Sequence, residues 1–462
     1  MNFTMIRNWV GQIGDKEFYE ACDRHGIMVW QDFWLANPVD GPNPYYTEMF
    51  NANACDYLKR IRNHPSIGIY VGRNEGNPPA GIDDYLRGLV FREHPGLYYI
   101  SNSAMGVVSG GGPYRALSPK SYFQSYGHDK FHSERGMPNV MNYESMLLTF
   151  GTDKIEPVNT SETPNPVYGL HDYTLGGGKG SSAQAASSFN DMIEKAFGRP
   201  RDAKQFAEWA QWINYDGYRA IFEGRSEHRR GMLLWMSHSA WPSMVWQTYD
   251  YYFDPNAAYF GCKKASEPLH IQWNPLRDDI EVVNYHAFDR TGLTATASLF
   301  NQDGTLQWTR ETKLDIKEDQ TVACFPLEQP ETLSDTYFIK LSLTDSDGKQ
   351  LPDNFYWRGK EDGNYKSLLQ LPKVSVCKNV TVKKTGKEWL IRAVLKNEAR
   401  TPALMLRLKV AGEKSGRMLL PVFYSDNYFS LLPGEVKEVD IRLYDADTYG
   451  EKPVLEVLGF NL

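Results

Sequence analysis

The sequence predicts a multidomain protein in which an α/β part is followed by an all-β part. The chain has 462 residues, and at about 150 residues per domain this length corresponds to roughly three domains. Before residue 273 short apolar strands alternate with helical segments, whereas after it strands of period two are separated by turns. Hydrophobic residues make up 41% of the chain, which is enough for sizeable cores.

The first region favours a (β/α)8 TIM-type barrel. Short apolar strands alternating with helices predict a parallel sheet, and over about 270 residues they suit a barrel better than an open sheet. A further strand is expected between residues 114 and 125, where the pattern is weak. The predicted strands are 4–9, 26–30, 67–72, 97–102, 130–133 and 232–236, and the predicted helices are 15–25, 47–63 and 202–223.

Two immunoglobulin-like β-sandwiches are predicted after the barrel. Apolar and polar residues alternate in segments 280–284, 293–299 and 337–343, and turn signals at 301–304 and 345–348 indicate hairpins. This module is expected to end near residue 366, and the rest of the chain repeats the pattern. We therefore place the domains at residues 1–272, 273–367 and 368–462.

Composition argues against several classes of protein. The net charge of −7 makes a dedicated nucleic-acid binder a poor candidate, and no run of about 18 apolar residues predicts a membrane span. The five cysteines form no CxxC pair and the ten histidines no HExxH pattern, so no metal site is predicted. Glycine runs at 110–112 and 176–178 lack the residues of a phosphate cradle and are predicted as loops.

Two glutamates follow predicted strands at the face where a barrel holds its active site. Glu75 comes just after strand 67–72, and Glu134 comes just after strand 130–133. Because the carboxyl ends of barrel strands meet at one face, we expect both carboxylates in one cleft. Retaining glycosidases use such a pair, with one carboxyl protonated and the other ionised. Taken alone, each glutamate is more consistent with a solvated loop carboxylate, and it is the pair at two strand ends that favours the catalytic interpretation.

Several motifs resemble family 2 glycoside hydrolases, in particular β-mannosidases and exo-β-D-glucosaminidases. Asn-His-Pro-Ser-Ile at 63–67 followed by Gly-Arg-Asn-Glu at 72–75 resembles the acid/base signature of that family. Phe-His-Ser-Glu-Arg-Gly at 131–136 resembles its nucleophile strand. Further segments resemble the family in the same order, at 18–23, 26–32, 235–242, 249–252, 263–270 and 424–435. The resemblance covers nearly the whole chain and implies a retaining, exo-acting β-glycosidase.

The resemblance implies a role for individual residues. Glu75 matches the acid/base and Glu134 the nucleophile. Asn74 matches an asparagine that binds the sugar 2-substituent, and Trp235 matches a tryptophan that forms the floor of the sugar pocket. The other expected substrate-binding residues are Arg7, Trp9, Asp32, His171 and Trp241. A structural salt bridge is an equal alternative for Asp32, a structural loop for His171, and a place in the core for Trp241. The mechanism requires no cofactor and no metal, and the partner is an oligosaccharide or glycan.

Two departures from the family pattern affect these expectations. Exo-β-D-glucosaminidases tend to carry Ser-Asp where this chain has Asn74 and Glu75, so the preferred substrate is a β-mannoside. A β-glucosaminide comes next, followed by a β-galactoside or β-glucuronide.

The second departure concerns the N-terminus. The family places its acid/base after strand four, and counting back from strand 67–72 leaves strand one without sequence. We therefore expect an N-terminally incomplete barrel with an open seam, through which copies could self-associate. The alternative function is a catalytically impaired, carbohydrate-binding remnant. The compartment is not set by this sequence, although the resemblance implies a periplasmic or secreted enzyme.

Overall fold

The parallel strands of the first region form two sheets. The computed structural model describes residues 1–125, 130–175, 184–227 and 230–462. One sheet has the order β1-β2-β3-β4 and the other β5-β6-β7. Their bounds are β1 Met5–Asn8, β2 Met28–Asp32, β3 Ile67–Arg73, β4 Tyr98–Asn102, β5 Val108–Ser109, β6 Phe131–Arg135 and β7 Met232–Leu234. Each predicted strand outside 114–125 is present, with small shifts at its ends.

The predicted strand between residues 114 and 125 is wrong. This segment contains the helix α4 (Pro119–Gln124), and the missing strand is the two-residue β5 further upstream. The Ser118 side chain accepts a hydrogen bond from the Ser121 backbone N–H, and Pro119 occupies the first turn. These are ordinary signals for the start of a helix.

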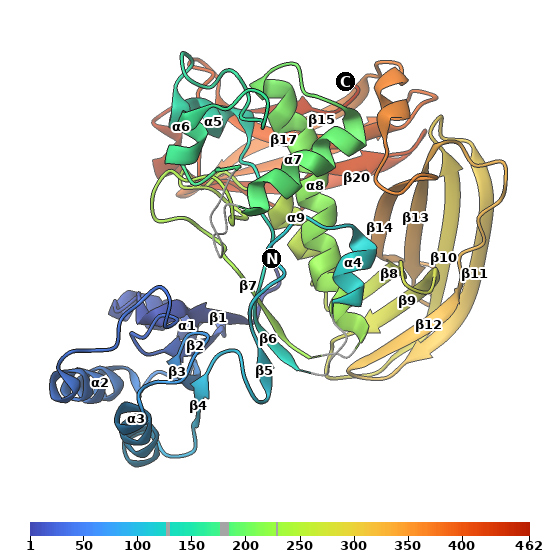
Figure 1. Cartoon of the computed structure of the whole chain (residues 1–462). Helices are drawn as coiled ribbons and strands as arrows, with labels where there is room; N and C mark the ends of the chain where they lie inside the picture. The colour runs from blue at the N-terminus through green and yellow to red at the C-terminus, as the bar shows by residue number, and fades with distance from the viewer. Residues whose placement is uncertain (126–129, 176–183, 228–229) are drawn as a thin grey trace.

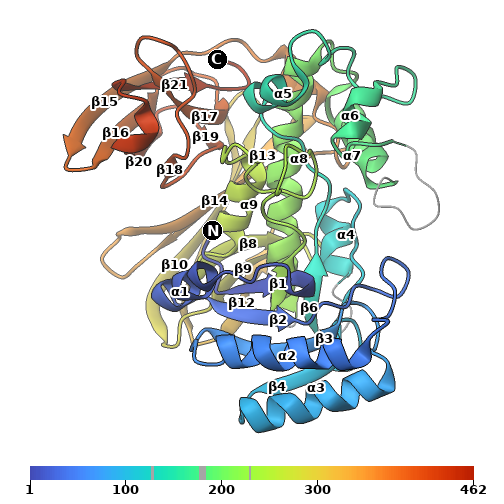
Figure 2. The same ribbon diagram turned by 90° about the vertical axis from the view of Figure 1, so that its left-hand side faces the viewer.

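The two parallel sheets enclose one apolar core. Every strand from β1 to β7 contributes to it: Met5, Trp30, Ile69, Val71, Ile100, Val108, Phe131 and Leu233. A second cluster packs helices α1, α2 and α3 against β2 and β3, and Figure 2 shows α2 and α3 along the outer side of this sheet. The helices of the region are α1 Lys16–His25, α2 Thr47–Ile61, α3 Ala80–Glu93, α5 Tyr143–Phe150, α6 Pro166–Leu170, α7 Gln184–Phe197, α8 Ala203–Glu223 and α9 Ala257–Ala265.

Helix α8 lies at the centre of the molecule, between the parallel strands and the two β units (Figure 1). The Asp202 carboxylate caps its start by accepting a hydrogen bond of 2.8 Å from the Gln205 backbone N–H. Nearly every residue from Phe206 to Glu223 is buried, as expected of a helix with neighbours all round. No helix in the described part of the chain has both the length and the apolar character needed to cross a membrane.

Two antiparallel units follow, each built from two sheets. The first has the orders β12-β9-β8 and β11-β10-β13-β14, and the second β15-β16-β20-β18 and β19-β17-β21. Because β8 already begins at Leu269, the first unit starts slightly before the predicted boundary at residue 272. The strands are β8 Leu269–Asn274, β9 Asp279–Asn284, β10 Arg290–Asn301, β11 Leu306–Ile316, β12 Gln320–Pro326, β13 Thr336–Thr344, β14 Gln350–Gly359, β15 Val376–Thr385, β16 Glu388–Asn397, β17 Ala403–Gly412, β18 Phe423–Tyr424, β19 Phe429–Leu431, β20 Val436–Tyr444 and β21 Pro453–Leu458.

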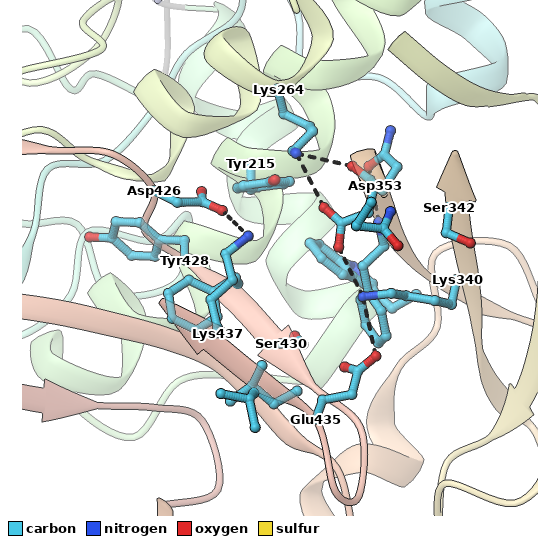
Figure 3. A pocket seen from close by; sticks show the side chains of 17 residues that line it. Tyr215, Lys264, Lys340, Ser342, Asp353, Asp426, Tyr428, Ser430, Glu435 and Lys437 are labelled. Carbon is cyan, nitrogen blue, oxygen red and sulfur yellow. Dashed lines mark hydrogen bonds and ion pairs between the residues drawn. The ribbon is translucent and has the colours of Figure 1, made fainter. Parts of the chain in front are cut away.

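A charged cavity of about 230 Å³ lies where the helical region and both β units meet. We call it the charged junction (Figure 3). Lys264 Nζ of α9 lies 3.6 Å from Asp353 Oδ1, and Lys340 Nζ lies 3.1 Å from Asp353 Oδ2. Lys437 Nζ lies 2.7 Å from Asp426 Oδ2. The acids are thus paired with lysines. The Lys264–Asp353 pair joins the helical region to the first β unit, and Lys340 Nζ, which also lies 3.4 Å from Glu435 Oε1, joins the two β units.

Candidate active site

The two predicted glutamates lie at the carboxyl ends of β3 and β6. Glu134 is in β6 and almost completely buried, whereas Glu75 lies two residues beyond β3 and is partly exposed. The Glu75 backbone has a φ of 46°, and its N–H donates a hydrogen bond of 2.9 Å to Ser103 Oγ. Such a left-handed backbone costs a residue with a side chain about 1–3 kcal/mol, so the surrounding contacts must hold it.

The side chains of Glu75 and Glu134 interact directly. Burial raises the pKa of Glu134 to about 8; Arg7 opposes this rise, and the hydrogen bond and negative charge of Glu75 add to it. Arg7 Nη1 lies 3.7 Å from Glu134 Oε2. Two carboxyl groups in contact cannot both ionise readily, so the pair holds a proton at neutral pH.

A hydrogen-bonded network fixes Arg7 beside this pair. Its Nη2 donates hydrogen bonds of 2.7 Å to both Asp32 Oδ2 and Asn74 Oδ1. Asp32 is completely buried, and its other oxygen accepts a hydrogen bond of 2.7 Å from Trp30 Nε1. These contacts favour the salt-bridge alternative for Asp32: it orients Arg7 and does not face an open cleft.

Aromatic side chains stand beside the carboxyl pair. The ring centroids of Trp9 and Trp235 are 5.4 Å apart, and those of Tyr114 and Trp235 are 6.2 Å apart. Gly136, which follows β6, packs against the Trp235 backbone so closely that a Cβ there would overlap the Trp235 carbonyl oxygen. The motif glycine thus allows Trp235 to approach the strand that carries Glu134.

Tyr114 is a site residue that sequence reasoning missed. Its side chain hydrogen-bonds to Glu134, and burial together with the two glutamates raises the pKa of its hydroxyl. Gly111 lies beside Glu75, since a Cβ on it would be 3.8 Å from Glu75 Oε1. The glycine run 110–112 therefore lines the site, whereas the run 176–178 lies outside the described residues. The glycine run that leads to Tyr114 was the one available signal.

His171 and Trp241 form a separate contact. Their rings stack with centroids 5.8 Å apart, and His171 Nδ1 donates a hydrogen bond of 2.5 Å to the Pro242 carbonyl oxygen. Within the described residues, the ring contacts and hydrogen bonds of these two side chains do not extend to either glutamate. No three His, Cys, Asp or Glu side chains of the described chain are grouped so as to hold a metal ion.

Curated proteins of similar sequence include several glycosidases. The mannosylglycoprotein endo-β-mannosidase of Lilium longiflorum is 26% identical over 100% of this chain and 60% of its own length. The exo-β-D-glucosaminidase of Amycolatopsis orientalis is 28% identical over 98% of this chain and 48% of its own length. The chain therefore spans about half the length of the curated relatives it matches.

Solved structures share the fold. The exo-chitosanase of Amycolatopsis orientalis superposes with a TM-score of 0.87 at 24% identity, over 100% of this chain and 59% of that one. A β-D-mannosidase from Dictyoglomus thermophilum gives a TM-score of 0.75 at 20% identity, over 99% of this chain and 56% of that one. Residues 354–462 match the family model of the exo-β-D-glucosaminidase Ig-fold domain.

The resemblance to β-mannosidases and exo-β-D-glucosaminidases is therefore confirmed, with matches that cover 98–100% of this chain. Further relatives are named exo-β-D-glucosaminidase and β-mannosidase B.

Proposed function

We propose that this chain is a retaining β-glycosidase, with Glu75 as the acid/base and Glu134 as the nucleophile. One observation carries the proposal: two carboxyl groups from the ends of parallel strands interact directly, and a guanidinium stands beside one of them. Retaining enzymes need their two carboxyl groups close together, at about 5–5.5 Å, because no water has to fit between nucleophile and sugar.

Arg7 decides which glutamate takes which role. Its guanidinium lies 3.7 Å from Glu134 Oε2 and favours the negative charge on Glu134, so we assign the nucleophile to Glu134 and the proton donor to Glu75. In the first step Glu134 attacks the anomeric carbon while Glu75 protonates the departing glycosidic oxygen. The bond between that oxygen and the anomeric carbon breaks, and a glycosyl ester on Glu134 forms.

The second step reverses these roles. Glu75 has given up its proton and now accepts one from a water molecule, whose oxygen attacks the anomeric carbon. The ester bond breaks, Glu134 returns as a carboxylate, and the sugar leaves with its original anomeric configuration. The Tyr114 hydroxyl, which hydrogen-bonds to Glu134, is placed to orient the Glu134 carboxylate before it attacks the anomeric carbon.

Substrate binding is proposed for the residues around the pair. The Trp235 and Trp9 rings offer apolar faces to the C–H bonds of a pyranose, and Asn74 offers an amide beside Arg7. The Asn74-Glu75 pair favours a β-mannoside, whereas several relatives and the C-terminal family model favour a β-glucosaminide. We therefore propose an exo-acting enzyme for terminal β-mannose, with β-glucosamine as the second choice.

The architecture supports the same proposal. We infer that the two parallel sheets form part of a (β/α)8-type barrel, because all their strands share one core. We infer that the antiparallel units are immunoglobulin-like sandwiches, with domains close to residues 1–272, 273–367 and 368–462, except that the first sandwich already begins with β8 at Leu269.

A hydrolysis panel with product analysis tests this function. The chain and its Glu134→Gln variant are incubated with phenyl β-mannoside, β-glucosaminide, β-galactoside, β-glucoside and β-glucuronide, and proton NMR identifies the first anomer released. We expect turnover of the mannoside or glucosaminide, the β-anomer first, and no turnover by the variant. An α-anomer first, unchanged activity of the variant, or binding without turnover would contradict the proposal.

A further inference from the structure

We propose that Arg73 is a positioning residue for the acid/base, acting through the loop 35–43. The inference rests on the proposed function, since it takes Glu75 as the proton donor. Arg73 is the last residue of β3, two positions before Glu75, and is only 2% exposed. A buried arginine at this point must direct its charge and its N–H groups toward specific partners.

The guanidinium of Arg73 binds three points of the loop that follows β2. Nε donates a hydrogen bond of 2.7 Å to the Ala36 carbonyl oxygen, and Nη2 donates one of 3.1 Å to that of Gly41. Nη1 donates one of 2.6 Å to Asn43 Oδ1. The planar fork of an arginine can span three such acceptors, whereas a lysine ammonium cannot reproduce this geometry.

The loop in turn contacts the residues on both sides of Glu75. On one side, the Asn74 N–H donates a hydrogen bond of 2.9 Å to the Leu35 carbonyl oxygen. On the other, Pro38 packs on Gly76, where a Cβ would lie 2.9 Å from Pro38 Cδ. The left-handed turn at Glu75 is therefore held from the loop as well as by Ser103, and Arg73 keeps the loop in place.

This arrangement matters for proton transfer. A general acid must come within about 2.6–3.2 Å of the atom that it protonates, and a misplacement of 1 Å can cost about 100-fold in rate. If Arg73 positions Glu75, its loss affects only substrates whose leaving group needs the proton.

The test compares leaving groups in Arg73→Lys. Phenyl and 2,4-dinitrophenyl β-mannosides and β-glucosaminides are used, because a dinitrophenolate departs without protonation. We expect kcat/KM for the phenyl glycoside to fall by about 10- to 100-fold, while kcat/KM for the dinitrophenyl glycoside changes by less than about threefold. An equal loss on both substrates, or no loss on either, overturns the proposal.

Arg219→Lys is the matched control. Arg219 is also buried, and its Nη1 donates hydrogen bonds of 2.7 Å to the Phe355 carbonyl oxygen and 2.9 Å to Asn354 Oδ1, far along the chain from both glutamates. Any loss in this variant is expected to be equal for the two leaving groups. A leaving-group effect as large as that of Arg73→Lys would overturn the specific role of Arg73.

A second readout does not depend on turnover. Amide hydrogen exchange of Asn74 and Glu75 is measured in the wild type and both variants. We expect faster exchange at these two amides in Arg73→Lys and unchanged exchange in Arg219→Lys. Unchanged exchange in Arg73→Lys overturns the proposal, even if no glycoside is hydrolysed. Absence of hydrolysis together with faster exchange would contradict the proposed function and leave the positioning contact supported.

Discussion

The site and the charged junction both hold acidic side chains that are at least partly buried, but their pKa values are shifted in opposite directions. At the junction, Lys264 and Lys340 lower the pKa of Asp353 although its burial works in the other direction. Lys437 does the same for Asp426, with its Nζ at 2.7 Å. At the site Glu134 faces another carboxyl group, its guanidinium partner lies 3.7 Å away, and its pKa rises to about 8.

The comparison distinguishes acids that stabilise the fold from acids that can transfer a proton. Acids that are matched by lysines stay ionised and join parts of the chain, so they have no proton to give at neutral pH. Two carboxyl groups in contact, with one cation beside Glu134, retain a proton that can be transferred. The cavity at the junction is therefore lined by acids and lysines that stabilise the structure and supply no transferable proton.

The largest expected effect comes from Glu134→Gln. Removing the nucleophile should lower kcat/KM for the preferred phenyl glycoside by about 10⁴-fold or more, as removal of a central catalytic group does elsewhere. Steady-state kinetics checks this loss. Asp353→Asn is the control at the junction, with kcat/KM expected within about twofold of the wild type because no reacting group is touched. Comparable losses of kcat/KM in both variants would contradict the claim that the carboxyl pair is catalytic and the charged junction is structural.

Gly136→Ala should have the next largest effect. The new Cβ would overlap the Trp235 carbonyl oxygen, so the backbone that carries the Trp235 ring has to move. We expect a loss of about 100-fold in kcat/KM and a destabilisation of about 1–3 kcal/mol. Gly81→Ala is the control, because a Cβ at that position would meet no neighbouring group within 4 Å and alanine suits a helix. Wild-type activity of Gly136→Ala would be incompatible with the close packing of Gly136 on Trp235.

The pH dependence of stability should distinguish the two regions by sign. Because the folded-state pKa of Glu134 is raised from 4.5 to about 8, the folded state binds more protons in this window. The contribution of Glu134 to the free energy of unfolding is fully present below pH 4.5 and is lost as the pH rises to about 8. It changes by no more than about 1.4 kcal/mol per pH unit. Urea unfolding from pH 5 to 8 should show a flatter profile for Glu134→Gln. An identical slope would mean that the Glu75–Glu134 pair does not hold a proton in this pH range.

Asp426→Asn should have the smallest effect. Its ion pair with Lys437 is partly exposed, so the loss of stability at pH 7 is about 1 kcal/mol. Because the pKa of Asp426 is lowered from its ordinary 3.8, this contribution is present above that value and is lost as the pH falls below it. The midpoints of urea unfolding of the variant and the wild type should therefore converge in acid. A gap that persists at low pH would show that the lost stability is not electrostatic.

Strands could be predicted where apolar residues form a run, and site residues could be predicted where they follow the end of such a strand. The strands that carry Glu75 and Glu134 have apolar runs, and the rule that barrel sites lie at strand ends brought the two residues together. The two-residue strand β5 has no period to detect, so the helix α4 was mistaken for a strand. Tyr114 follows an irregular glycine loop, and only the folded chain shows its contact with Glu134.

The partners of individual side chains were the other feature that the sequence could not predict. The sequence left Asp32 open between substrate binding and a salt bridge, because nothing local shows that Arg7 reaches it. Similarly, the three hydrogen bonds of Arg73 join residues 30 or more positions apart, which no local pattern encodes.

Covalent trapping of the nucleophile tests the central claim most directly. The chain is incubated with 2-deoxy-2-fluoro-β-D-mannosyl fluoride or the corresponding glucosyl fluoride, and the digested protein is analysed by mass spectrometry. We expect one fluorosugar per chain, attached to Glu134, and no label in Glu134→Gln. A label on Glu75 or another residue, or turnover of aryl glycosides with no label at Glu134, would contradict it.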